Sequence, residues 1–334
     1  MCYLLTLAAF AFVLYWIYTK YSSKLTVPNL NGRAVLITGC DHGFGRDLTL
    51  CLSAKGLTVF AGCLTEEGIQ YLQQKEINGN INPLKIDVRK KTDVTEAYEY
   101  ITNDLGNTDF IFGLWALINN AGVSGTVAPD DWLTEEDYRS VLEVNTIGAI
   151  RVTHQFKELV KTARGRIVMM SSICGLINIP GMAPYCVSKH ALEGYAVNLR
   201  QEMKPFGVSV HILNPGLFRT PIITVEKFRN SIQTAWNSTP EHIRTQYGEH
   251  FFRRYRKAYC KAMEVWASSR TEMVIDAYTH AISALYPQAH YWVGYDVIFG
   301  LLPFSYLPLN LQDTIGYWIQ RIAGYPAPQI AAEQ

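Results

Sequence analysis

Short apolar runs alternate with longer stretches of helical periodicity between residues 33 and 214, and this alternation restricts the fold more than any other feature. The apolar runs are RAVLIT (33–38), LTVFAGC (57–63), NPLKID (82–87), GLWALIN (113–119), RIVMMS (166–171) and VSVHILN (208–214). Helical patterns lie between them, for example over 92–105, 135–161 and 186–204. Strands that alternate with helices pair in parallel, so the sequence predicts a doubly wound α/β sheet with helices on both faces.

Composition narrows the classes of partner. The 334 residues are 49% hydrophobic and 18% charged, which suits a packed globular chain rather than a disordered one. A formal net charge of +1 gives no global field that would attract nucleic acid, and we expect no nucleic-acid partner. The seven cysteines are scattered without a C-x-x-C pair. They predict buried thiols in a reducing compartment, with no metal site and no disulfide framework.

The first eighteen residues, MCYLLTLAAFAFVLYWIY, contain no charged side chain. As a helix they would be about 27 Å long, close to the hydrocarbon thickness of a bilayer. No small-residue cleavage site follows, and Trp16 and Tyr21 suit the membrane interface. We interpret 1–22 as an uncleaved transmembrane anchor rather than a buried helix. The first basic residues follow the eighteen-residue apolar stretch, so the positive-inside rule places the body of the chain in the cytosol.

A glycine-rich stretch, TGCDHGFG (38–45), joins the first predicted strand to a helix. Gly39, Gly43 and Gly45 permit a tight turn and let the backbone approach a pyrophosphate at the helix N-terminus. Glycine triplets are common in turns, but this one opens the first strand-to-helix unit of an alternating chain. The sequence therefore predicts a dinucleotide-binding site.

The end of the second predicted strand bears on the choice between NAD and NADP. It continues as Thr65-Glu66-Glu67, and two carboxylates would repel a 2′-phosphate. His42 and Arg46, in and after the glycine loop, act in the opposite direction. We expect NAD rather than NADP.

Two Tyr-x-x-x-Lys pairs occur, Tyr185/Lys189 in YCVSK and Tyr71/Lys75 in YLQQK. A pattern this short arises by chance, so it cannot by itself separate a reacting phenol from two residues that share a helix face.

Several motifs together resemble the short-chain dehydrogenase/reductase family across 33–295. They are TGCDHGFG, LINNAG (117–122), VNTIG (144–148), MMSSICG, YCVSK and LNPGLFRT (213–220), in the family's order. The resemblance implies a Rossmann-like fold and a tetrad of Asn145, Ser172, Tyr185 and Lys189. It prefers Ser172 to Ser171 because Ser172 lies thirteen residues before Tyr185, the common family spacing. One departure is His42, where this subgroup usually carries Ser.

The same resemblance implies a set of cofactor contacts. Asp87 would approach the adenine, Asn119, Ala121 and Gly122 would line the adenosine side, and Thr220 would hold the nicotinamide carboxamide. The implied set is Gly39, Gly43, Phe44, Gly45, Asp87, Asn119, Ala121, Gly122, Tyr185, Lys189, Pro215, Gly216 and Thr220. Ser172 and Tyr185 would contact the substrate.

The chemistry explains these residue types. Oxidation of an alcohol requires its hydroxyl proton to leave, and a free tyrosine with a pKa near about 10 is a weak base at pH 7. A cation one helical turn away, together with a positive nicotinamide ring, favours the phenolate. Ser172 would hydrogen-bond the substrate oxygen, and Asn145 fits the family's role of holding a water that connects Lys189 to solvent. We therefore interpret Tyr185/Lys189 as the reacting pair and Tyr71/Lys75 as a coincidence.

Two subgroups of the family compete for the substrate. GLWALINNAGV, DDWLTEEDY (130–138) and LLPFSYLPLNLQD resemble the membrane-bound retinol and 17β/3α-hydroxysteroid dehydrogenases. FAGCL, APYCVSK and VIDAYTHAI (274–282) resemble the mitochondrial (R)-3-hydroxybutyrate dehydrogenases. An acidic substrate would require a cation in the pocket, which Arg219 or the run RRYRK (253–257) could supply. We favour a retinoid or hydroxysteroid.

Three segments follow from this interpretation: the anchor at 1–22, a catalytic domain at 30–295 and an apolar tail at 296–334. A helical insertion at about 217–265 carries bulky apolar residues that suit a lid over a lipid, although helix packing explains them equally well. The tract VIFGLLPFSYLPL (297–309) is too short to span a bilayer. It suits the membrane interface, with ordinary packing as the alternative.

The predicted protein is thus an endoplasmic-reticulum membrane enzyme with its catalytic domain in the cytosol; the mitochondrial inner membrane is the alternative. The resemblance also implies a homodimer, because family members commonly pair through the helix that carries the Tyr. A membrane-tethered protein that binds cofactor without turnover is the competing class, and the intact tetrad argues against it. No Gly-x-Ser-x-Gly elbow is present, so we set acyl transfer aside.

Overall fold

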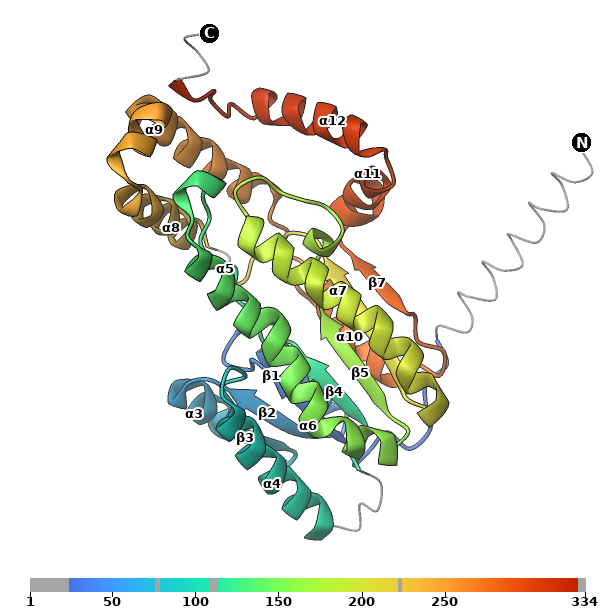
Figure 1. Cartoon of the computed structure of the whole chain (residues 1–334). Helices are drawn as coiled ribbons and strands as arrows, with labels where there is room; N and C mark the ends of the chain where they lie inside the picture. Colours follow the sequence, from blue (N-terminus) through green and yellow to red (C-terminus); the bar gives the residue numbers. More distant parts are fainter. Residues whose placement is uncertain (1–23, 76–78, 108–112, 222–223, 330–334) are drawn as a thin grey trace, which may run out of the picture.

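The computed structural model describes residues 24–75, 79–107, 113–221 and 224–329. Its centre is a seven-stranded sheet in which every pair of neighbours runs parallel (Figure 1). The strands are β1 (Ala34–Thr38), β2 (Thr58–Cys63), β3 (Ile81–Lys85), β4 (Ala116–Asn119), β5 (Arg166–Met170), β6 (Ser209–Pro215) and β7 (His290–Val293). Their order is β3-β2-β1-β4-β5-β6-β7, so the direction of winding reverses between β1 and β4. In doubly wound sheets, ligands bind at the carboxyl ends of the strands beside this reversal.

Helices cover both faces of the sheet, as the alternation predicts. On one face Leu36 packs with residues of α4 (Lys91–Asn107), α6 (Ala149–Thr162) and α7 (Ala183–Met203). On the other face Val35 and Ile37 pack with α2 (Gly43–Ala54), α3 (Glu66–Lys75) and α10 (Glu272–Ser283). Side chains of a strand alternate between faces, which explains why one strand feeds two cores. The Rossmann-like fold is confirmed.

Two elements of the main fold were not predicted from the sequence. β7 extends the sheet beyond β6, but its four residues HYWV give a short, half-buried run. Helix α10 lies beyond the predicted insertion at about 217–265, and its Val274, Tyr278 and Ile282 pack in the second core. Helices α8 (Val225–Ser238) and α9 (Glu241–Trp266) make up most of that insertion and contribute no residue to the two sheet cores.

Helices α8 and α9 build a third, aromatic core. Trp132 lies 4.8 Å from Trp236 between ring centroids, and Trp236 stacks on Phe252 at 4.9 Å. Phe228 and Phe251 are buried in the same cluster. These bulky residues, which suited a lipid lid, are therefore mostly internal packing of the helix pair.

The C-terminal segment is helical. A π-helical turn, η5 (Val297–Leu301), runs into α11 (Leu302–Ser305), and α12 (Leu309–Ile322) follows. The predicted anchor at 1–22 lies outside the described residues. Within 24–75, 79–107, 113–221 and 224–329, no helix is both long and apolar enough to cross a membrane.

Candidate active site

A single cavity of about 1350 Å³ lies at the carboxyl ends of the strands, beside the point where the winding reverses. One end is formed by the glycine loop and the turn after β2. The middle is lined by Ser172, Tyr185 and Lys189, and the other end by apolar residues of α9, η5 and α12. The cavity has room for a dinucleotide and a second molecule, because single-ligand pockets are typically about 300–1000 Å³.

The glycine loop has the geometry of a phosphate cradle. Gly39 and Gly43 have φ angles of +72° and +63°, which L side chains rarely adopt. A Cβ on Gly45 would lie 2.3 Å from the Gly39 carbonyl oxygen, so the absence of a side chain lets α2 pack against the loop. Helix α2 begins at Gly43, and its N-terminal amides point at the cavity end that would hold a pyrophosphate.

Two buried nitrogen atoms around this loop lack a hydrogen-bond partner among the described residues. Among the described residues, His42 Nδ1 and Arg46 Nε are buried and make no hydrogen bond. Asp41, which the sequence analysis missed, accepts hydrogen bonds from the backbone amides of Leu64 at 2.9 Å and Thr65 at 2.8 Å. These contacts tie the glycine loop to the turn after β2. Unpaired buried donors beside a glycine cradle fit an anionic dinucleotide.

Of the residues expected at the adenine and adenosine side, Asp87 lines the cavity and Asn119 does not. The Asp87 carboxylate lines the cavity and accepts two hydrogen bonds from Arg89, at 2.8 and 2.7 Å. These bonds hold the pKa of Asp87 below its usual value. Asn119 instead donates to Thr153 at 2.9 Å, away from the cavity, because neighbouring residues along a strand face opposite sides. Its neighbour Asn120 lines the cavity in its place.

Ser172 and Tyr185 meet at the cavity wall. Ser172 follows β5 and caps the short turn η3 (Ile173–Gly175), where its Oγ accepts from the amide of Cys174 at 3.2 Å. Tyr185 lies in the first turn of α7 and lines the cavity together with Ser172, whose side chain lowers the pKa of the phenol. Ser171 Oγ is buried without a partner near Glu193. The geometry therefore agrees with Ser172 rather than Ser171 as the serine that faces the phenol.

Lys189 lies one helical turn after Tyr185 and is almost completely buried. Its Nζ donates to the Met170 carbonyl at 2.7 Å and lies 5.5 Å from the centroid of the Tyr185 ring. Burial lowers the pKa of Lys189 to about 8. The carboxylate of Glu193, one turn further along α7, opposes that shift. Burial also raises the pKa of Tyr185, while the Ser172 side chain lowers it. In the protein without ligand, Lys189 alone therefore does not produce the expected fall in the pKa of Tyr185.

Asn145 lies on η2 (Glu143–Gly148), a π-helical turn between α5 (Glu135–Leu142) and α6. Its side chain exchanges hydrogen bonds with the backbone of Val123, at 2.8 and 2.9 Å, and donates to Ser188 Oγ at 3.0 Å. A Cβ on Gly122 would lie 3.3 Å from Asn145 Oδ1 and 3.8 Å from Lys189 Nζ. The missing side chain of Gly122 thus leaves a space between the amide and the ammonium, where the predicted water would sit.

A buried polar network behind the tetrad was not predicted. Asn214, on β6, donates to the Ser172 carbonyl at 3.0 Å and to Glu193 Oε1 at 2.5 Å. His290, on β7, lies 3.3 Å from Asn214 Oδ1. The sequence offered one signal, a glutamate four residues after Lys189, but it could not show that this carboxylate is buried. The network fixes the backbone that carries Ser172.

The loop after β6 is held from the C-terminal side. Pro215, Gly216 and Thr220 line the cavity, as predicted. A Cβ on Gly216 would lie 2.1 Å from Asp296, whose carboxylate accepts from the Leu217 amide at 3.2 Å. Asp296 therefore positions the loop that would face a nicotinamide.

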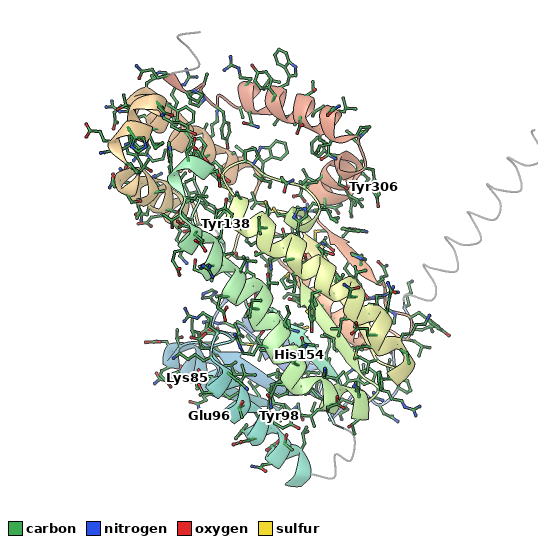
Figure 2. The ribbon with its side chains drawn as sticks, viewed as in Figure 1. Lys85, Glu96, Tyr98, Tyr138, His154 and Tyr306 are labelled. Carbon is green, nitrogen blue, oxygen red and sulfur yellow. The ribbon has the colours of Figure 1, made fainter. Side chains whose placement is uncertain are left out.

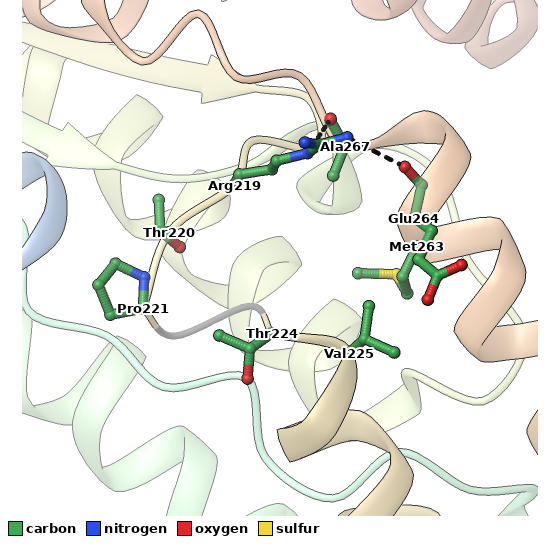
Figure 3. A pocket seen from close by; sticks show the side chains of 8 residues that line it. All are labelled: Arg219, Thr220, Pro221, Thr224, Val225, Met263, Glu264 and Ala267. Atoms are coloured by element: carbon green, nitrogen blue, oxygen red, sulfur yellow. Dashed lines mark hydrogen bonds between the residues drawn. The ribbon is translucent and has the colours of Figure 1, made fainter.

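The cation proposed for an acidic substrate is engaged elsewhere. Arg219 Nε donates to the Ala267 carbonyl at 3.0 Å, and a second guanidinium nitrogen donates to Glu264 at 3.2 Å (Figure 3). These carbonyls end α9, where a positive charge is favourable. The RRYRK run is absent from the residues that line the cavity, and its Arg256 lies over Phe252 at 4.9 Å.

The second Tyr-x-x-x-Lys pair has a different environment. Tyr71 and Lys75 lie on α3, with the Lys75 ammonium 5.8 Å from the Tyr71 ring centroid. The Tyr71 ring carries the guanidinium of Arg46 at 4.0 Å, and neither Tyr71 nor Lys75 lines the cavity. The pair therefore lies outside the cavity that Ser172 lines.

Comparison with known proteins agrees with the geometry. A family model described as short chain dehydrogenase matches residues 33–229. The chain is 38% identical to a 3beta-hydroxysteroid dehydrogenase of Caenorhabditis elegans, over 94% of this chain and 81% of the relative. It is 36% identical to retinol dehydrogenase 7 of Rattus norvegicus (89% and 92% covered) and 37% identical to 17-beta-hydroxysteroid dehydrogenase type 6 of Bos taurus (90% and 93%).

Solved structures share the fold at low sequence identity. A short-chain dehydrogenase from Streptomyces avermitilis matches with a TM-score of 0.66 and 20% identity, covering 89% of this chain and all of that one. A short chain dehydrogenase from Burkholderia cenocepacia, in complex with NADP, matches with a TM-score of 0.63 and 19% identity, covering 86% and 98%.

The matching family model and the dehydrogenases among its relatives define an NAD(P)-dependent oxidoreductase that acts on CH–OH donors. The chain belongs to the short-chain dehydrogenase/reductase family, in the subgroup of retinol and hydroxysteroid dehydrogenases.

Proposed function

We propose that this protein is an NAD-dependent enzyme that interconverts a lipophilic alcohol, a retinoid or a hydroxysteroid, and its carbonyl. The observation that carries the proposal is the continuity of one cavity. It joins the glycine loop to Ser172 and Tyr185, and then continues between apolar side chains of α9, η5 and α12. A cofactor at one end and an apolar alcohol at the other would meet at the phenol.

Tyr185 is the proposed general base, and the other three members of the tetrad support it. During oxidation its oxygen takes the proton of the substrate hydroxyl, while the Ser172 hydroxyl hydrogen-bonds the substrate oxygen as it becomes a carbonyl. A bound NAD would supply the hydride acceptor for the carbinol carbon and a positive charge near the phenol. The Lys189 ammonium favours the phenolate, and Asn145 holds the water through which the proton leaves. Reduction uses the same groups in reverse.

NAD is preferred over NADP because the ribose end of the cavity is the more acidic side. Asp41 and Glu67 both line it, against a single nearby cation, Arg46. The Arg46 guanidinium is partly occupied by its stacking on Tyr71. A 2′-phosphate would lie close to two carboxylates, which costs free energy.

The substrate end favours an apolar molecule over a hydroxy acid. Ile179, Met182, Tyr259, Met263 and Phe304 line it. Lys227, which also lines the cavity, donates to the Pro221 carbonyl at 2.5 Å. Arg219 is bonded to the Ala267 carbonyl at the C-terminal end of α9. Retinol and hydroxysteroid dehydrogenases are also the relatives of this chain. The apolar wall therefore supports a retinoid or steroid rather than (R)-3-hydroxybutyrate.

The proposal extends to location and organisation. The segment 1–22, whose first eighteen residues carry no charge, would anchor the chain in the endoplasmic-reticulum membrane, with the catalytic domain (30–295) in the cytosol and the tail (296–334) at the interface. A homodimer through α7 completes the proposal.

The test is turnover by full-length protein in detergent with NAD or NADP. The alcohols are all-trans-retinol, androstane-3α,17β-diol and (R)-3-hydroxybutyrate. Turnover of the retinoid or steroid, with NAD the better cofactor, is the expected result. Turnover of hydroxybutyrate alone would overturn the substrate and the compartment. Cofactor binding without turnover of any alcohol would indicate the catalytically silent class.

A further inference from the structure

Helix α12 is an amphipathic helix that the body of the protein does not cover. None of its fourteen residues is buried. Figure 1 shows it set apart from the sheet, at the end of the molecule that also carries α9 and α11. Trp318 and Ile322 are 60% and 84% exposed, far more than apolar side chains of this size in a packed helix.

Three of the exposed apolar residues of α12 share one face. At 100° per residue, Leu311, Trp318 and Ile322 project within about 40° of one another. The charged residues Asp313 and Arg321 project from other sides. Such a helix suits a boundary between an apolar and a polar phase.

The same apolar surface surrounds the mouth of the cavity. Trp266 at the end of α9, Phe299 on η5 and Ile319 on α12 line the cavity and are 67%, 78% and 56% exposed. Tyr306, in the turn after α11, is a further exposed aromatic ring on the C-terminal segment (Figure 2). Three separate elements therefore place apolar side chains around one opening. Exposure of these apolar side chains to water costs free energy.

We propose that the apolar face of α12, together with this rim, lies in the outer layer of a lipid bilayer and opens the cavity directly to the membrane interior. A lipophilic alcohol would then enter without crossing water. The proposal rests on the proposed function for the identity of the substrate, but the docking of α12 does not depend on turnover.

The features of this surface favour a bilayer over a second protein chain. Trp318 and Tyr317 lie on one short helix with a polar opposite face, the composition of helices that lie in a membrane interface. A protein partner that covered the rim would close the mouth of the cavity, because Trp266, Phe299 and Ile319 line it. Lipid is mobile and leaves a route for substrate. The charge-free first eighteen residues also supply a separate reason for the chain to be at a membrane.

The first test measures lipid contact at α12 in the full chain reconstituted into phosphatidylcholine vesicles. Ile322→Cys is labelled with an environment-sensitive fluorophore, and Asp313→Cys, nine residues earlier and on the opposite side, is the matched control. Cys40, Cys63, Cys174, Cys186 and Cys260 are buried, and labelled wild type corrects for background. We expect a blue shift and quenching by doxyl lipids at 322 and neither at 313. A blue shift at 322 without doxyl quenching would mean that protein covers this face, and no shift would mean that water does. Either result overturns the proposal.

The second test separates delivery from chemistry. In the variant Trp318→Glu/Ile322→Glu, we expect KM for vesicle-borne retinol to rise about tenfold, which corresponds to about 1.4 kcal/mol. KM and kcat for cyclohexanol, a water-soluble alcohol, should not change. Asn310→Glu/Gln320→Glu adds the same charge on the sides that carry Asp313 and Arg321 and should affect neither substrate. Equal effects of the two variants, or an unchanged KM for vesicle-borne retinol, would contradict membrane entry. Failure of wild type on every alcohol would refute the proposed function and leave the fluorescence test valid.

Discussion

The Nζ of Lys189 donates to the Met170 carbonyl at 2.7 Å, so the cation beside the proposed base is fixed by the end of β5. Its pKa of about 8 lies below the ordinary value of 10.5 because the ammonium is buried. The folded chain therefore binds fewer protons than the unfolded chain between about pH 8 and 10.5.

This difference predicts a pH dependence of stability. Below pH 8 the folded chain carries the full free-energy cost of burying a charged lysine. This cost decreases as the pH rises from 8 to 10.5. Relative to Lys189→Met, wild type should gain unfolding free energy across this window, by at most about 3 kcal/mol. Denaturant titrations of both proteins from pH 7 to 10.5 measure the difference in unfolding free energy. Contributions from titratable groups that both proteins share cancel in this difference. A difference that does not vary with pH would show that Lys189 titrates normally.

Ser172 and Ser171 provide a matched pair. The Ser172 side chain lowers the pKa of the Tyr185 phenol, while Ser171 Oγ has no partner among the described residues. We expect Ser172→Ala to lower kcat about a hundredfold and Ser171→Ala to change it less than about threefold. Steady-state kinetics on the best alcohol measure both. Similar losses in the two variants would point to a folding effect rather than to contact with substrate.

The acidic ribose end predicts a change in cofactor preference. Glu67 lines the cavity, whereas Glu66 lies outside it and pairs with Lys85 at 3.4 Å. Glu67→Lys should raise the ratio of kcat/KM for NADP to that for NAD about tenfold, because a cation replaces a repelling carboxylate. Glu66→Lys carries the same charge change and should leave the ratio within about threefold. A larger effect at Glu66 would indicate that the 2′-position of the bound cofactor lies nearer to Glu66 than to Glu67.

The buried Glu193 predicts a positioning effect on Ser172. Glu193→Leu would remove one of the two acceptors of the Asn214 amide and should destabilise the fold by about 1–3 kcal/mol. Glu193→Gln keeps an acceptor oxygen and should lose less than half of that. Loss of the carboxylate should also lower the pKa of Lys189 further, because Glu193 opposes the effect of burial. Thermal unfolding and the pH profile of kcat measure the two effects. Equal stability of the two variants would refute the role of the hydrogen bond.

The sequence predicted the sheet well because periodicity and glycine placement are local properties. All six predicted strands match β1 to β6 within a few residues. It did not predict β7, whose four residues become a strand only by pairing with β6. The face on which α10 packs is also a tertiary property, and its helical pattern alone does not reveal it.

The site shows the same division. The family resemblance named Asn145, Ser172, Tyr185 and Lys189, which lie close together in the structure, although their roles are proposals. The side chain of Asn119, which was expected at the adenosine side, donates to Thr153 instead, because neighbouring residues along β4 face opposite sides of the sheet. The supporting carboxylates, such as Asp296, could not be found from the sequence, since they act on segments far away in the chain.

The most direct test of the central claim compares Tyr185→Phe with wild type in cofactor binding and in turnover. Tyr100→Phe, an exposed tyrosine on α4, is the control for loss of a phenol. With Tyr185 as general base, Tyr185→Phe should bind NAD with nearly unchanged affinity and lose about a thousandfold in kcat on retinol or the androstanediol. If Tyr185→Phe keeps wild-type turnover, Tyr185 is not the base and the proposed mechanism is wrong.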